Sequence, residues 1–73
     1  MTLRWTPERL DQLERATRNG LRVALSRRGT EYVVTALRMT STGNRDAFIG
    51  KLPMTGEEMT FVLEEIEELQ ILT

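Results

Sequence analysis

The chain has 73 residues and a formal net charge of −1, and a domain this short buries only about 60% of the surface its unfolded chain exposes, which excludes a large hydrophobic core. The sequence contains no Cys and no His, which excludes disulfides, the usual zinc ligands, the commonest general base and a thiol nucleophile. We therefore expect one non-enzymatic domain over residues 1–73 that binds no metal and no cofactor.

A helix is predicted over residues 6–19. Thr6 is suited to cap its first turn, and Pro7 is suited to the first helical position, where its missing N–H costs nothing. Gly20 can take the left-handed conformation that ends many helices. Trp5 directly precedes the cap, where an apolar residue often packs against the first turn, so we favour a structural role for its side chain over a ligand-stacking role.

Residues 21–72 are predicted to form strands. Apolar and polar residues alternate over residues 21–26, as in a half-buried strand. After a break at Arg27-Arg28-Gly29-Thr30, the β-forming residues 31–38 continue the pattern. This arrangement predicts a hairpin that carries two arginines at its tip.

The middle of the chain is more polar. Residues 39–46 contain Gly43-Asn44, and this composition predicts a turn or a mobile loop. A third strand is expected over residues 47–52. Pro53 cannot donate a hydrogen bond to a neighbouring strand, which predicts a sheet edge or a bend at that end.

The stretch 57–72 fits two incompatible layouts. As a helix, it places most of its apolar residues on one face and its glutamates on the opposite face. As two strands, it places Phe61 and Leu63 on one face and gathers the glutamates in a turn around Ile66. We favour the strands, because Thr55-Gly56 marks a turn between two segments of alternating character.

The favoured layout is a mainly β fold, in which an N-terminal helix packs on a strongly bent sheet of about five antiparallel strands, the last two joined by a tight turn. The alternative is an α+β fold with a helix, three strands and a C-terminal helix. In the favoured fold, one core is expected to contain Leu13, Leu25, Val34, Phe48, Phe61, Leu63 and Ile66.

The charges are distributed unevenly along the chain. Residues 1–45 hold nine Arg against four Asp or Glu, a net +5, and residues 46–73 hold one Lys against seven Asp or Glu, a net −6. Such asymmetry is typical of proteins with oppositely charged partners, but the two halves can also neutralise each other within one fold or between protomers. The candidate nucleic-acid contacts are Arg22, Arg27, Arg28, Arg38, Arg45 and Lys51. The candidate protein contacts are Glu8, Asp11, Glu14, Glu64 and Glu65.

Two stretches carry a family resemblance: Leu13-Glu14-x-Ala16-x4-Leu21-x-Val23-x-Leu25 and Gly56-Glu57-x3-Phe61-x-Leu63-Glu64-x-Ile66, which together span about 55 residues. In the helix-and-strand layout they resemble the Rof (YaeO) family, small SH3-like barrels of the Sm-like type that bind and inhibit the bacterial transcription terminator Rho. The resemblance implies that the acidic residues of the helix, here Glu8, Asp11 and Glu14, face a basic nucleic-acid surface on Rho.

The helical layout of the C-terminal stretch has its own resemblance. The segment Leu52-Pro-Met-Thr55-Gly-Glu57-Glu58-Met59-x-x-Val62 is similar to the strand-to-helix junction of the PC4-like single-stranded-DNA-binding cofactors. That resemblance implies a module that binds single-stranded nucleic acid.

We expect an accessory or regulatory function through macromolecular binding, with a protein partner ahead of nucleic acid. The remaining alternative is a structural protein. Because the chain lacks the disulfides and metal sites that stabilise many small domains, we also expect weak self-association. Its apolar runs are far shorter than the roughly 20 residues of a membrane span, and no basic-then-apolar leader opens the chain. These features predict a soluble protein of the cytoplasm with no membrane partner, and the resemblance to the Rof family implies a bacterial one.

Overall fold

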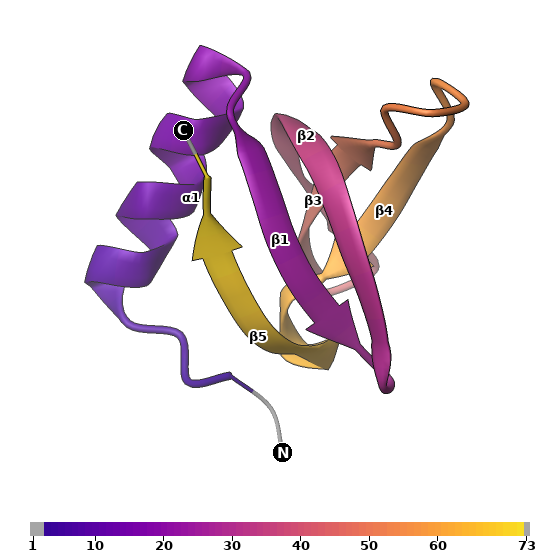
Figure 1. Cartoon of the computed structure of the whole chain (residues 1–73). Helices are drawn as coiled ribbons and strands as arrows, with labels where there is room; N and C mark the ends of the chain where they lie inside the picture. The colour runs from indigo at the N-terminus through magenta and orange to yellow at the C-terminus, as the bar shows by residue number, and fades with distance from the viewer. Residues whose placement is uncertain (1–2, 73) are drawn as a thin grey trace.

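The chain folds as an N-terminal helix followed by five antiparallel strands (Figure 1) in a computed structural model that describes residues 3–72. In chain order the elements are α1 (Pro7–Asn19), β1 (Arg22–Arg27), β2 (Thr30–Thr42), β3 (Arg45–Lys51), β4 (Glu58–Val62), the 3-10 turn η1 (Leu63–Glu65) and β5 (Ile66–Ile71). The predicted mainly β fold with an N-terminal helix is confirmed. The alternative with a C-terminal helix is wrong, because the stretch after residue 57 forms β4, η1 and β5.

Helix α1 begins and ends where the sequence predicted. The Thr6 hydroxyl accepts a hydrogen bond from the Arg9 amide at 3.2 Å. Gly20 has a left-handed φ of 63° and donates its backbone N–H to a carbonyl of the last turn. Before the helix, the Trp5 indole Nε1 donates to the Leu63 carbonyl at 2.8 Å. The predicted structural role of Trp5 is confirmed, because this bond ties the segment before α1 to η1.

The long strand β2 bends the sheet. Its first half pairs with β1 and its second half with β3, and the halves meet at Thr35, which is the partner of Arg22 on one side and of Lys51 on the other. A register shift between Ala36 and Arg38 marks a bulge at the same place. Bulges increase the local bend and twist of a strand, so the two halves of the sheet curve around one core.

Of the turn or mobile loop predicted over residues 39–46, the turn at Gly43-Asn44 is confirmed, and the longer loop is wrong. Residues 39–42 continue β2 and residues 45–46 begin β3, so the turn is confined to Gly43-Asn44. The threonines of this segment suit a pleated strand because they are β-branched. Gly43 has a φ of 61°, and a two-residue hairpin turn requires such a conformation. The polar composition therefore reflects an exposed hairpin rather than irregular structure.

Strands β4 and β5 lie at opposite edges of the sheet, whose pairing order is β4-β3-β2-β1-β5. The predicted tight turn between them exists, because η1 connects β4 directly to β5. The two strands do not pair with each other, however, since η1 carries the chain from one edge of the sheet to the other. The sheet is therefore not a closed barrel. The predicted turn at Thr55-Gly56 lies within a longer connection from β3 to β4, in which the Leu52 amide donates to the Glu57 carbonyl at 2.8 Å.

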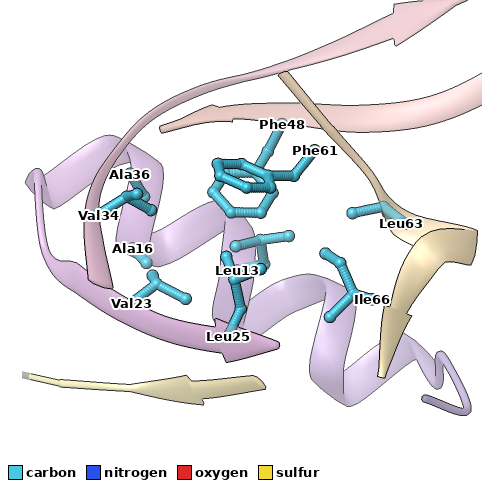
Figure 2. Close-up of a cluster of buried hydrophobic side chains, with 10 residues drawn as sticks. All are labelled: Leu13, Ala16, Val23, Leu25, Val34, Ala36, Phe48, Phe61, Leu63 and Ile66. Carbon is cyan, nitrogen blue, oxygen red and sulfur yellow. The ribbon is translucent and has the colours of Figure 1, made fainter. Parts of the chain in front are cut away.

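The core fills the concave side of the sheet (Figure 2). All seven residues predicted for it belong to one buried cluster: Leu13, Leu25, Val34, Phe48, Phe61, Leu63 and Ile66. The cluster also contains Ala16 from α1, Val23 from β1 and Ala36 from β2. Figure 2 shows the rings of Phe48 and Phe61 overlapping at its centre. The core therefore joins α1, η1 and strands from both halves of the sheet.

Candidate functional site

The two oppositely charged halves of the sequence meet at one end of the fold. The Arg28 guanidinium lies 3.1 Å from the Glu65 carboxylate, and the Arg45 guanidinium lies 3.7 Å from the same carboxylate and 3.5 Å from that of Glu64. We call Arg28, Arg45, Glu64 and Glu65 the Arg–Glu cluster. Its existence shows that part of the charge asymmetry is neutralised within one fold.

Three turns place these side chains together. Arg28 lies in the hairpin turn between β1 and β2, Arg45 directly follows the turn between β2 and β3, and the two glutamates lie in η1. The backbone N–H of Gly29 also donates to the Glu67 carboxylate at 3.1 Å, which joins the first hairpin to the start of β5. The tip of the β1–β2 hairpin is thereby held against the acidic turn.

Arg28 is the one non-glycine residue within residues 3–72 with a positive φ, at 52°. With Gly29 at 77°, both central residues of the turn have positive φ, as in the type I′ turn, which favours Asn-Gly. A left-handed conformation costs an ordinary L-residue roughly 1–2 kcal/mol. The exposed pair with Glu65 contributes no more than about 1 kcal/mol, so Arg28 is not the residue that turn stability alone favours.

We therefore expect Arg28→Asn to raise the free energy of unfolding by roughly 0.5 kcal/mol, and by more at high salt, where the lost ion pair contributes less. Urea denaturation at two salt concentrations measures the change. Arg28→Ala is the matched variant, because it loses the same ion pair without gaining a residue suited to the turn. If the Asn variant were no more stable than the Ala variant, the turn would not strain Arg28.

The Arg27 side chain reaches from β1 to β4, two strands that do not pair with each other. Its guanidinium donates to the Thr60 carbonyl of β4 and to the Tyr32 hydroxyl, both at 3.4 Å. The same group lies 5.0 Å from the ring centroid of Phe61 and 5.3 Å from that of Tyr32, within the range of cation–π attraction. Arg27 thus links β1 to β4 where no backbone ladder joins them, and its role as a nucleic-acid contact stays a prediction.

Arg27→Ala is expected to lower the free energy of unfolding by about 1–2 kcal/mol, because the variant loses the cation–π contacts with Phe61 and Tyr32 and the hydrogen bond to the Thr60 carbonyl. Arg27→Lys keeps the charge and most of the stem but loses the planar group that reaches both partners. We expect the Lys variant to fall between the Ala variant and the wild type in thermal melting. Equal melting temperatures for all three proteins would contradict the bridging role.

The other predicted basic contacts fall into two groups. Arg38 pairs with Glu58 of β4 at 3.5 Å. Arg22 and Lys51 are exposed, and neither forms an ion pair within residues 3–72. Four of the six candidates therefore contact acceptors of the same chain: Arg27, Arg28, Arg38 and Arg45.

The predicted acidic contacts divide in the same way. Glu64 and Glu65 belong to the Arg–Glu cluster, so they are already engaged. Glu8, Asp11 and Glu14 are exposed on α1, and of these three Asp11 forms an ion pair, with Arg15 at 3.0 Å. The structure brings Arg28 and Arg45 together with Glu64 and Glu65 and leaves the helix acids apart.

Sequence reasoning missed the part that Arg27 plays in the fold. The available signal was its register, since Arg27 follows Val23 and Leu25 at a spacing of two, and both of those residues are buried. A charged residue on the inward face of a strand commonly covers apolar surface with its stem.

Within residues 3–72, no helix is long and apolar enough to cross a membrane, and no group of acidic side chains is placed to hold a metal ion. Comparisons of the chain with protein-family models, with curated proteins and with solved structures give no match. The function is therefore inferred from the surface of the fold.

Proposed function

We propose that this chain is a small non-enzymatic accessory protein that binds a basic surface of a partner protein through α1. The observation that carries the proposal is the division of charges: four of the six basic candidates contact acceptors of their own chain, whereas Glu8 and Glu14 of α1 form no ion pair within residues 3–72. The resemblance to the Rof family supports the same assignment and names Rho as the transcription factor to test.

Phosphate binding by the Arg–Glu cluster would require its arginines to leave their carboxylates. A phosphate brought to Arg28 or Arg45 would also lie close to Glu65, and the repulsion between like charges would oppose binding. Glu8 and Glu14 form no ion pair within residues 3–72, so a Lys or Arg of a partner would meet a free carboxylate.

We further infer that the bent sheet is an SH3-like small barrel of the Sm-like type, left open between β4 and β5. The antiparallel order β4-β3-β2-β1-β5, the preceding helix and the single 3-10 turn between the edge strands support this assignment. In this arrangement α1 packs against β2 and β5 through its buried residues Leu13 and Ala16. This packing leaves Glu8, Asp11 and Glu14 exposed, with Arg9, Arg15 and Arg18 exposed between them.

The second candidate is a single-stranded nucleic-acid-binding module. One observation favours it: Arg22 and Lys51 are exposed, form no ion pair within the described part of the chain, and are both register partners of Thr35. They therefore lie on either side of β2, roughly 10 Å apart across two strand spacings. Two cations at that separation can contact neighbouring phosphates of one strand.

Titrations with purified Rho and with mixed single-stranded oligonucleotides, each at low and at physiological salt, separate the two candidates. We expect Rho to bind and Glu8→Gln/Glu14→Gln to weaken that binding about tenfold. Asp46→Asn/Glu57→Gln changes the net charge equally at exposed positions away from α1, and it should leave binding unchanged. Salt-dependent oligonucleotide binding that is lost in Arg22→Glu/Lys51→Glu, without binding to Rho, would establish the second candidate instead.

A further inference from the structure

The outer face of strands β5, β1 and β2 contains a trough. Its floor is formed by Ala24 and Ser26 of the central strand β1, whose side chains are small. Its walls rise from the residues that pair with them, which lie on β2 on one side and on β5 on the other. The depression has a volume of about 400 Å³. This face lies opposite the core, because the alternate residues Val23 and Leu25 point inward.

One end of the trough is acidic. Ser26 is the register partner of Glu31 on β2 and of Glu68 on β5, so a carboxylate stands on each side of its hydroxyl. Neither glutamate forms an ion pair within residues 3–72. The two carboxylates therefore flank a gap of about two strand spacings, roughly 10 Å, which is wide enough for a cationic side chain.

The other end of the same face is basic. Arg22 lies four residues before Ser26 on β1, roughly 13 Å away along the strand, and it is exposed. Ala24 lies midway between the two positions, and its register partner on β2 is Val33. The Val33 side chain is 46% exposed and is one of two large exposed apolar side chains within residues 3–72. The face thus has Arg22 at one end, an apolar centre and the two glutamates at the other end, where Arg4 of the segment before α1 also lines the surface.

We propose that this face binds a second copy of the chain, with the two faces related by a two-fold axis that crosses the strands at Ala24 and Val33. Rotation about that axis places Arg22 of each copy over Ser26 of the other, between Glu31 and Glu68. It also places the two Val33 side chains together at the centre. A two-fold interface forms each contact twice, so one surface supplies both complementary ends, and two sheets packed face to face are a common arrangement.

The expected association is weak. A standard interface buries roughly 800 Å² on each partner, and three short strands with one exposed apolar side chain at their centre offer less. Exposed charge pairs are screened by salt. The dimer should therefore form at high protein concentration and dissociate as salt is raised.

Sedimentation velocity and equilibrium measurements with charge-reversed variants test the proposal. We expect Arg22→Glu to weaken self-association about tenfold or more, and Glu31→Lys/Glu68→Lys to do the same, because each variant places like charges opposite one another. An equimolar mixture of the two variants should associate again, because each face then meets its complement at both ends. Circular dichroism and thermal melting verify that both variants are folded.

Matched controls carry the same charge changes away from this face: Arg18→Glu for the first variant and Asp46→Lys/Glu57→Lys for the second. Both controls should retain wild-type association. A wild-type protein that stays monomeric at high concentration in low salt would overturn the proposal. So would association that persists in both charge-reversed variants, or a mixture that fails to associate.

Discussion

Phe61→Ala is expected to lower the free energy of unfolding by about 3–5 kcal/mol, the usual range for a buried Phe replaced by Ala. Phe61 is fully buried, its ring stacks on Phe48 with centroids 5.3 Å apart, and the edge of Tyr32 meets it at the same distance. Because a core of this size supplies little more than roughly 3–5 kcal/mol, the variant should be largely unfolded at room temperature. Circular dichroism during urea denaturation measures the change.

The matched control is Met54→Ala, since Met54 is 94% exposed in the connection between β3 and β4. Truncating an exposed side chain usually changes stability by less than about 0.5 kcal/mol. If Phe61→Ala had the same melting temperature as Met54→Ala, the Phe61 ring would not be buried at the centre of the core.

The size of the expected effect follows from where β4 lies. This strand is at the edge of the sheet and pairs with β3 on one side only. Its attachment to the other half of the fold depends on side chains, namely the ring of Phe61 in the core and the Arg27 guanidinium that reaches the Thr60 carbonyl. Removing the Phe61 ring also removes a surface on which Arg27 lies, so the loss of packing and the loss of the bridge occur together.

Local signals predicted the helix and the core well, because each depends on neighbours in sequence. The cap at Thr6 and the left-handed Gly20 define α1 through backbone hydrogen bonds within one turn. The alternation of Val23 and Leu25 assigned the inward face of β1 for a similar reason, since a strand has a side-chain period of two.

The partners of each strand could not be predicted in the same way. Strands β4 and β5 are adjacent in sequence, and a hairpin between them is the simplest expectation, yet β5 pairs with β1 instead. That choice depends on the bend in β2, which brings the end of β1 close to η1 and allows Ile66 to become the partner of Arg27. A bulge is a property of two paired strands, so it cannot be predicted from the sequence of either strand alone.

The candidate site was predictable in composition but not in arrangement. The basic and acidic residues were found by their charge, and internal neutralisation was one of the two explanations left open. The contact of Arg28 and Arg45 with Glu65 requires three turns, distant in sequence, to converge at one end of the sheet. Periodicity within any one segment carries no information about such a convergence.

Gly50→Ala is expected to destabilise the fold by about 3 kcal/mol, at the upper end of the range for an overpacked core. Gly50 is buried in β3, and an added Cβ would lie 2.5 Å from Val34 Cγ2 and 2.9 Å from Val34 Cβ. Its backbone is not in the left-handed region, so the penalty is a matter of space alone. Val34 cannot easily move away, because it is paired with Val23 in the centre of the sheet.

A double-mutant cycle separates this steric effect from other causes. Val34→Ala alone should cost about 2 kcal/mol through the cavity that it leaves, but it removes the Cγ2 atom that the new methyl group meets. The double variant Gly50→Ala/Val34→Ala should therefore be more stable than the sum of the two single changes predicts, by about 1 kcal/mol or more. The contact with Val34 Cβ remains at 2.9 Å, so full recovery is not expected. Strict additivity in urea denaturation would show that Gly50 is needed for a reason other than its close approach to Val34.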